Sequence, residues 1–439
     1  MKHTFKGGIH PREGKHLSKD KPIREYLPKG DTVYPVSQHI GAPAKPVVKK
    51  GDEVLVGQLI AEAGGFVSAN IHSSVSGRVK AVEKRLTASG AKVDSIIIEN
   101  DGLFKSVDMI GNDKPVKELT REEVIDAVKA AGIVGMGGAG FPAHVKLSPK
   151  EPDKIDTVIV NASECEPYLT SDYRRILEQA DEVIEGLRIV LAIFPGAKGI
   201  IAVEDNKPDA IELLKSRLAG DDDIRVNSLK TKYPEGAERQ LIYANTGRYI
   251  NSRMLPADAG CIVDNVETLV AIYNGVRFGR PLMNRTFTVT GDAVADPRNF
   301  SICIGTNFAE LLEAADGLCT DAKKLIAGGP MMGFALFDLN IPTTKTTSAL
   351  LCLSEDEASK YETTACINCG RCVEACPEQL VPSRLSDFAE HKQFELFEKW
   401  YGLECVECGS CSFGCPARRH LAQSIKSAKK LILASKRKK

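Results

Sequence analysis

Eight of the thirteen cysteines form two copies of one spacing pattern, C-x2-C-x2-C-x3-C-P. The first copy consists of Cys366, Cys369, Cys372 and Cys376, and the second of Cys405, Cys408, Cys411 and Cys415. A run of this kind aims three thiolates at one cubane and sends its fourth thiolate to the other cubane. We therefore predict one [4Fe-4S] cluster on Cys366, Cys369, Cys372 and Cys415, and a second on Cys376, Cys405, Cys408 and Cys411. Such a pair of clusters would carry electrons.

Zinc is the main alternative to iron for these cysteines. Structural zinc usually binds two C-x2-C pairs separated by a long spacer, and a third cysteine after two more residues would crowd one tetrahedral ion. Chance is excluded because the same four-cysteine run occurs twice. The remaining cysteines have no ligand spacing, and we expect them to be small apolar core residues: Cys165, Cys261, Cys303, Cys319 and Cys352.

A glycine-rich segment, GMGGAGFP at residues 135–142, is the second chemical signal. Four glycines in six residues let the backbone approach a ligand closely and turn its amides toward a phosphate. Taken alone, such a segment is often only a tight turn, and no clear strand leads into it as the dinucleotide fingerprint requires. Lys146 could neutralise a phosphate or a charge on reduced flavin, and Glu164 and Glu166 could accept hydrogen bonds from ribityl or ribose hydroxyls. Read singly, each residue favours a simpler explanation, with the lysine as a surface residue and the two acids as part of a helix start.

Three segments together resemble the flavoprotein subunit of respiratory complex I. They are GMGGAGFP with Lys146, NASECEP at residues 161–167, and NVET at residues 265–268, and EGAE at residues 235–238 is a fourth match. The resemblance implies non-covalent FMN and NAD(H) as substrate, with Phe141 and Glu166 facing the nicotinamide nucleotide. The other cofactor-binding residues that it implies are Gly135, Gly137, Gly138, Gly140, Lys146, Asn161, Glu164, Gly236, Glu238, Asn265 and Thr268.

The chain departs from that flavoprotein pattern at three places. Met136 stands where the family usually has arginine, Ala237 replaces a glutamate, and residues 253–256 lack a second aromatic. We therefore expect the affinity for NADH, or its orientation, to differ from that of the complex I flavoprotein.

The residues before the glycine-rich segment predict short strands and turns. Strands are expected at residues 45–48, 53–56, 59–63 and 78–82. Their order resembles a biotinyl/lipoyl-type flattened barrel, but the hairpin at 66–71 has no lysine for a swinging arm. A structural or docking role is therefore expected for this unit.

From about Leu119 the pattern changes to alternating helices and strands, which favours an α/β layer with a mostly parallel sheet. Thr120 and Glu123 predict a capping box at the start of a helix over 119–131. Further helices are expected at 174–190 and 209–218, and strands at 156–160 and 199–203. Residues 285–318 predict a small α+β unit with a strand at 285–290 and a helix at 308–315. One helix over 385–400 should separate the cysteine runs, which favours a helical ferredoxin-like module.

Charge and hydropathy narrow the class of protein. Lysine plus arginine and aspartate plus glutamate both number 58, so the bulk charge gives no case for nucleic acid. The longest apolar run, residues 189–194, is too short to span a bilayer, and residues 1–29 lack a signal-peptide layout. We therefore expect a soluble cytosolic chain. Its basic end, 426–439, could contact an anionic membrane or a partner, or could be a solvated terminus.

The whole chain resembles the RnfC family, which provides one subunit of the Rnf complexes, the membrane-associated ferredoxin:NAD+ oxidoreductases. The matching segments are TFKGGIHP at 4–11, the barrel, GMGGAGFP, residues 233–248, GGPMMG at 328–333 and the paired cysteine runs. The fold class that this implies is multidomain α/β with small β and α+β units. The expected domains are a barrel-sandwich domain at 1–115, an FMN/NADH-binding α/β domain at 116–282, a soluble-ligand-binding β-grasp domain at 283–350, a two-cluster ferredoxin-like domain at 351–424 and a basic tail at 425–439.

The Rnf resemblance also implies partners and a place in the cell. It implies a peripheral subunit on the cytoplasmic side of the membrane, docked on integral and ferredoxin-accepting subunits while those partners translocate ions. A flavin would explain why one chain combines a nicotinamide site with iron-sulfur clusters. Nicotinamide moves two electrons as hydride, a cubane accepts one electron, and a flavin can do both. Two alternatives are a cobalamin reductase of the propanediol-utilisation type, which resembles the same family, and a non-catalytic electron-relay or docking subunit.

Overall fold

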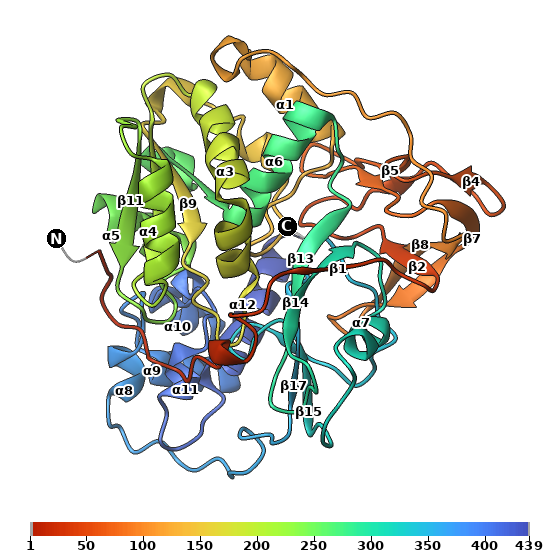
Figure 1. The fold of residues 1–439 in the computed structure, drawn as a ribbon. Coiled ribbons are helices and arrows are strands. Elements are labelled where there is room, and N and C mark those ends of the chain that lie inside the picture. The colour runs from red at the N-terminus through yellow and green to blue at the C-terminus, as the bar shows by residue number, and fades with distance from the viewer. Residues whose placement is uncertain (1–2, 438–439) are drawn as a thin grey trace.

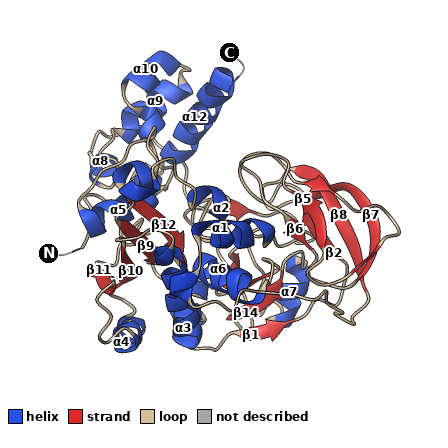
Figure 2. Ribbon diagram, turned by 90° about the horizontal axis from the view of Figure 1, so that it is seen from above, coloured by secondary structure: helices blue, strands red, loops and turns tan. Residues whose placement is uncertain are grey.

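The computed structural model describes residues 3–437. An α/β core lies in the centre, with an all-β unit on one side and a helical cysteine-bearing module on the other (Figures 1 and 2). A second mixed unit, built around β13 (Asn284–Thr290) and β14 (Arg298–Cys303), lies next to the core. The predicted multidomain α/β fold class, with its additional small β and α+β units, is therefore confirmed.

The core is a parallel four-stranded sheet in the order β11-β10-β9-β12. Its strands are β9 (Thr157–Ala162), β10 (Lys198–Glu204), β11 (Ile224–Leu229) and β12 (Cys261–Asn265). Both faces are covered, as the continuous apolar runs of these strands require. Asn161 and Asn265 are register partners at the carboxyl ends of β9 and β12. Carboxyl ends of parallel strands are where ligands bind in such sheets.

Helices cover this sheet unequally. One face is packed by α1 (Arg121–Ala130), α3 (Ser171–Ala192), α4 (Pro208–Arg217) and α6 (Val266–Phe278). The other face is packed by α5 (Glu238–Thr246) through Leu241 and Ile242. The predicted capping box of Thr120 and Glu123 is present at α1 and fixes where that helix begins.

The all-β unit has two antiparallel sheets, as the barrel resemblance predicts. One consists of β2 (Thr32–Pro35), β8 (Lys92–Asn100), β7 (Gly77–Leu86) and β4 (Glu53–Val54), and the other of β3 (Lys45–Pro46), β5 (Leu59–Glu62) and β6 (Ile71–His72). The strand expected at 78–82 extends to Leu86, because it pairs with β8, which the sequence interpretation did not include.

The β-grasp unit is a six-stranded sheet in the order β1-β14-β13-β17-β15-β16, with helix α7 (Phe308–Ala314). Its other strands are β1 (Arg24–Tyr26), β15 (Lys324–Ala327), β16 (Phe334–Ala335) and β17 (Ala349–Leu353). Strand β1 pairs with β14 and so lies in this sheet rather than in the barrel, and β17 extends the sheet to Leu353. Pairing over such sequence distances leaves no local signal.

The cysteine-bearing module is helical. It contains α8 (Arg371–Glu374), α9 (Pro382–Glu390), α10 (Phe394–Lys399), α11 (Ser410–Phe413) and α12 (Leu421–Arg437). The single helix predicted at 385–400 is wrong. Lys392 has a φ of 55°, a left-handed conformation, and this turn separates α9 from α10 and lets Phe397 enter the module's apolar core.

The basic end of the chain forms the long helix α12 rather than a solvated terminus. Its Ile425, Ala428 and Ile432 are buried against the cysteine-bearing module, whereas Leu431 is exposed. The expected tail at 425–439 is thus part of that module as far as residue 437, and Lys438 and Lys439 lie outside the described residues. Among the described residues, no helix is both long and apolar enough to span a bilayer.

Shorter elements connect these units. Helix α2 (Ala143–Lys146) follows the glycine-rich segment, and 3-10 turns lie at Lys15–Leu17, Val116–Glu118, Pro152–Lys154, Pro256–Ala259 and Gly402–Glu404.

Candidate functional site

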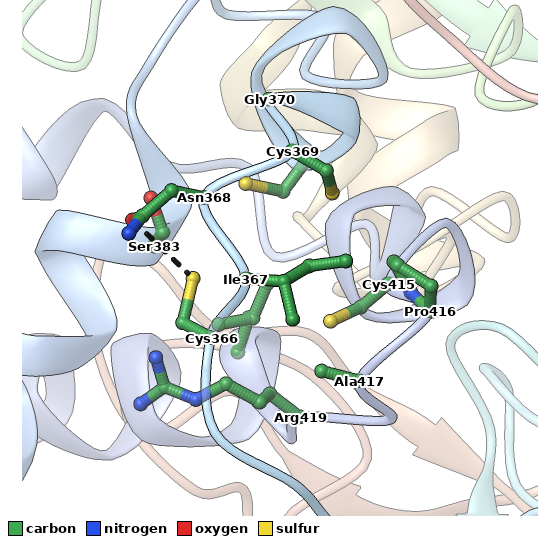
Figure 3. A pocket seen from close by; sticks show the side chains of 12 residues that line it. Cys366, Ile367, Asn368, Cys369, Gly370, Ser383, Cys415, Pro416, Ala417 and Arg419 are labelled. Carbon is green, nitrogen blue, oxygen red and sulfur yellow. Dashed lines mark hydrogen bonds between the residues drawn. The ribbon is translucent and has the colours of Figure 1, made fainter.

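Four cysteines surround a void of about 370 Å³ at the edge of the helical module. This outer thiol group consists of Cys366, Cys369, Cys372 and Cys415 (Figure 3). Cys366 and Cys369 are exposed, and Cys372 is buried. The grouping is the one that the spacing predicts, with three thiols from the first run and the last from the second.

The remaining four cysteines line a second void of about 360 Å³. This inner thiol group consists of Cys376, Cys405, Cys408 and Cys411. It is less exposed than the outer group, since Cys376, Cys408 and Cys411 are all buried. In the part of the chain that the structure describes, no three ligand side chains lie close enough together for a single metal ion. Four sulfurs that line one void instead fit a polynuclear cluster.

Burial controls the protonation of the inner thiols. It raises the pKa of Cys376 to about 12 and that of Cys405 to about 11, and neighbouring sulfurs add to the effect. Because only thiolates bind iron, metal loading must release these protons.

The glycine-rich segment meets the carboxyl ends of β9 and β12. The amide of Met136 donates to the Thr268 hydroxyl at 3.1 Å, and a side chain at Gly137 would come within 3.0 Å of Asn265. A side chain at Gly138, by contrast, would meet no atom within 4 Å, and Gly138 is exposed. The exposed glycines therefore leave their backbone open to a ligand.

Lys146 lies inside this site and is half-buried. Its Nζ donates to the Val263 carbonyl at 2.6 Å and to Asp264 Oδ1 at 3.1 Å. Burial alone would lower the pKa of Lys146, but the carboxylates of Asp264 and Glu238 outweigh it and raise the pKa. The side chain is therefore a fixed cation beside the glycine-rich segment, as a phosphate or a reduced flavin would require.

Asn161 and Asn265 connect this site to its surroundings. Asn161 Nδ2 donates to the Gly236 carbonyl at 2.8 Å, and Asn265 Nδ2 donates to Asp172 Oδ2 at 2.6 Å. Burial, with the nearby charges of Glu164 and Glu267, raises the pKa of Asp172 to about 8. Sequence reasoning missed Asp172 because it is an ordinary polar residue in the first turn of α3.

The acidic segment 161–170 follows β9, and its two glutamates face different parts of the chain. The Glu164 carboxylate accepts from the amides of Asp172 and Tyr173 and thereby caps α3. The Glu166 Oε1 accepts from the amides of Met331 at 2.7 Å and Met332 at 3.2 Å, which belong to the GGPMMG segment of the β-grasp unit. Both acids border the site, and their predicted contacts with FMN and NAD(H) stay predictions.

Two buried lysines hold the acidic segment in shape. Lys15 Nζ donates to the carbonyls of Glu164, Glu166 and Leu169 at 2.6–3.1 Å. Lys207 Nζ donates to the Ser163 carbonyl at 2.6 Å and to Glu204. Sequence reasoning missed both, because lysine is almost never fully buried and its type alone therefore predicts a surface position.

The inner thiol group adjoins the nucleotide-type site. The Tyr233 hydroxyl donates to the Cys408 carbonyl at 2.8 Å, and Tyr233 directly precedes the 234–238 segment that contains Gly236. A side chain at Gly409 would lie 3.5 Å from the Met331 carbonyl, so the segment that contacts Glu166 also contacts the cysteine run. On α5, Arg239 pairs with Glu378 at 2.9 Å and with Glu404 at 3.0 Å.

Family models match four consecutive parts of the chain. They are described as the RnfC barrel sandwich hybrid domain at 3–103, the Nuo51 FMN-binding domain at 128–274, the SLBB domain at 286–335 and the 4Fe-4S dicluster domain at 365–420. The predicted FMN and [4Fe-4S] cofactors are thereby confirmed at the level of domains. The individual contact residues stay predictions.

Two curated relatives align over most of the chain. The subunit designated C in the proton-translocating ferredoxin:NAD(+) oxidoreductase complex of Clostridium ljungdahlii is 45% identical over 92% of this chain and 88% of its own length. Its counterpart in the Na(+)-translocating complex of Acetobacterium woodii is 44% identical over 100% of this chain and 99% of its own length. The chain belongs to the RnfC family. The predicted resemblance is therefore confirmed.

One solved structure shares the fold at low sequence identity. An NAD+-reducing [NiFe]-hydrogenase in the air-oxidised state covers 74% of this chain and 69% of its own, with a TM-score of 0.50 and 19% identity. That likeness concerns the fold alone.

Proposed function

We propose that this chain is the NAD(H)-reacting subunit of a membrane-bound Rnf complex, in which it exchanges hydride with NAD(H) and single electrons with its partners. The carrying observation is that a flavin-type site and two four-thiol groups lie in one continuous body, connected through α5 and the Tyr233 segment. When bound, FMN supplies the conversion between hydride and single electrons, and the [4Fe-4S] clusters carry single electrons.

The residues of the nucleotide-type site fit FMN. The exposed backbone at 137–139 would bind the phosphate, and Lys146 would supply the positive charge. Asn161 and Asn265 lie side by side at the carboxyl ends of β9 and β12, and these strand ends line the site. Phe141 and Glu166 would face the nicotinamide nucleotide, and the GGPMMG segment holds the Glu166 carboxylate in one orientation.

The two thiol groups have different positions relative to this site. The inner thiol group contacts the α/β core through Tyr233 and lies beside the ion pairs of Arg239. The outer thiol group contacts mainly its own module and has two exposed cysteines. The inner group therefore serves the flavin side and the outer group the partner side.

Within such a complex this subunit lies on the cytoplasmic face of the membrane, and its partners translocate the ions. The two relatives described above are almost equally identical to this chain, yet their names state different ions, proton and Na(+). Because the two identities are nearly equal, this subunit need not differ between complexes that translocate different ions. Among the described residues, no helix is long and apolar enough to span a membrane.

A dye-linked assay of the isolated, cofactor-loaded chain tests this function. We expect anaerobic NADH oxidation coupled to a one-electron dye, and we expect Lys146→Met to lower that rate while Lys150→Met, at an exposed position four residues away, leaves it unchanged. If the loaded chain contains flavin but no NADH is oxidised with any one-electron dye, the proposed NAD(H) reaction is wrong.

A further inference from the structure

The N-terminal arm, residues 4–15, runs from the cysteine-bearing module to the α/β core (red in Figure 1). The Gly8 amide donates to the Ala375 carbonyl at 3.0 Å, directly before a cysteine of the inner thiol group. Ile9 exchanges two backbone hydrogen bonds of 2.9 Å with Tyr233. The first half of the arm is therefore fixed beside the inner thiol group.

The second half of the arm holds the acidic segment that follows β9. The Glu13 carbonyl accepts from the Tyr168 amide at 2.6 Å, and Lys15 Nζ donates to three carbonyls of the segment. Glu164 and Tyr168 have φ angles of 47° and 69°, which are left-handed conformations that residues with side chains rarely adopt. Such residues persist only where their surroundings fix them. Lys15 therefore holds a backbone conformation that would relax without it.

Lys15 and Lys207 together set the direction of two peptide groups. Lys207 Nζ binds the Ser163 carbonyl at 2.6 Å, and Lys15 Nζ binds the next carbonyl, that of Glu164, at 2.8 Å. A trans peptide places its carbonyl and its N–H on opposite sides, so the amides of Glu164 and Cys165 point away from both lysines. Among the described residues, neither amide donates to a protein atom. Because amides in a largely buried segment nearly always have a partner, these two indicate a ligand.

The two amides lie next to predicted flavin contacts. Cys165 Sγ accepts from the Gly236 amide at 3.2 Å, and Asn161 Nδ2 donates to the Gly236 carbonyl at 2.8 Å. Reducing a flavin by two electrons with uptake of one proton leaves a negative charge on its ring. Fixed hydrogen-bond donors that face a developing negative charge stabilise it without reorganising. Donors in this place would therefore favour the reduced flavin over the oxidised one.

We propose that Lys15 is a positioning residue for bound FMN, which orients the amides of Glu164 and Cys165 toward the flavin ring and so stabilises its reduced form. The inference rests on the proposed function, because it requires FMN beside the acidic segment. Lys15 lies in the part of the chain matched as the RnfC barrel sandwich hybrid domain, 3–103, and not in the matched FMN-binding domain, 128–274. The N-terminal arm thus completes a site that most of its residues do not share in sequence.

The test compares oxidised and reduced FMN in Lys15→Met, which keeps a long side chain but removes the donor. The full chain carrying its clusters and FMN is reduced stepwise with dithionite beside a reference dye, and fluorescence quenching gives the affinity of the FMN-depleted chain for oxidised FMN. Reduced FMN should lose about tenfold more affinity than oxidised FMN, which equals a fall in the two-electron midpoint potential of about 30 mV. The control Lys6→Met, at an exposed position of the same arm, should change neither quantity.

An equal loss of affinity for both oxidation states, or an unchanged midpoint potential, would overturn the proposal, because a lysine that only supports the fold affects both forms alike. If Lys15→Met binds no FMN, Lys15→Gln, which keeps a neutral donor, is measured instead, and a smaller difference in the same direction is expected. Loss of FMN binding in both variants would also overturn the proposal. Flavin bleaching of the unchanged chain by NADH tests the proposed function separately, since the comparison of variants uses a chemical reductant.

Discussion

Lys146 carries the electrostatic part of the flavin site at the level of single residues. Its ammonium group lies against Asp264, and its raised pKa keeps it protonated at neutral pH. Replacing it with methionine removes a charge-assisted hydrogen-bond donor, so the affinity for FMN should fall about 10- to 100-fold, equivalent to about 1.5–3 kcal/mol. Flavin fluorescence quenching on titration with the apo-chain measures this, with Lys150→Met as control. Unchanged affinity in Lys146→Met would show that the lysine only holds β12 in place.

Glu235 gives a prediction about pH. Both of its carboxylate oxygens are buried with no hydrogen-bond partner in the described structure, and burial raises its pKa to about 8, with the Glu204 charge adding to this effect. Since the folded pKa lies above the unfolded value, the charge on Glu235 costs stability as the pH rises above the unfolded pKa and up to about 8.

Glu235→Gln should therefore stabilise the chain more at about pH 8.5 than at about pH 5. Chemical denaturation at the two pH values measures the difference, and Glu151→Gln, at an exposed position, is the control. A stability gain that does not change with pH would mean that Glu235 is already neutral or solvated in the folded state.

At the level of elements, the GGPMMG segment joins the β-grasp unit to the acidic segment. A Cβ added at Gly329 would lie 2.2 Å from Glu166 Cγ, a distance that no packing tolerates. Gly329→Ala should therefore displace the segment and lower stability by about 1–3 kcal/mol, as overpacking does. Thermal unfolding measures this effect, and Gly30→Ala, where the nearest atom is 3.5 Å away, should cost little. Equal melting temperatures for Gly329→Ala and the unchanged chain would contradict the close contact.

The elements also show what sequence can predict. Helices α1 and α3 and strands β9, β10 and β13 follow from local signals, namely the Thr120 cap, helical periodicity and apolar β-branched runs. The break between α9 and α10 has no glycine or proline to announce it, and it depends on how Phe397 packs. The pairing of β1 with β14 joins residues nearly 280 positions apart, and no local pattern encodes such a contact.

The candidate site was predictable to a similar extent. Cysteine spacing fixes which thiols gather, because the geometry of a cubane limits the spacing of its ligands. The roles of Lys15 and Lys207 were not predictable, since they depend on carbonyl groups that converge only in the folded chain.

At the level of the whole molecule, Arg239 joins the cysteine-bearing module to the α/β core. It pairs with two glutamates of the module and is mostly buried. Arg239→Met should loosen this junction and cost about 1.5–3 kcal/mol, because charge-assisted hydrogen bonds are lost and two carboxylates remain partly buried. After a pulse of NADH, stopped-flow absorbance should show slower cluster reduction with unchanged flavin bleaching. Arg217→Met, which breaks an exposed pair with Asp181, is the control and should change neither phase.

The central claim is that one polypeptide connects NAD(H), flavin and two clusters. The most direct test is an anaerobic NADH titration of the chain loaded with FMN, iron and sulfide, followed by flavin absorbance and by electron paramagnetic resonance of the clusters. The account predicts that flavin absorbance bleaches and that signals of reduced [4Fe-4S] clusters then appear, with about eight iron atoms per chain. A chain that holds FMN and iron at these levels, yet shows neither bleaching nor cluster reduction with excess NADH, would contradict it.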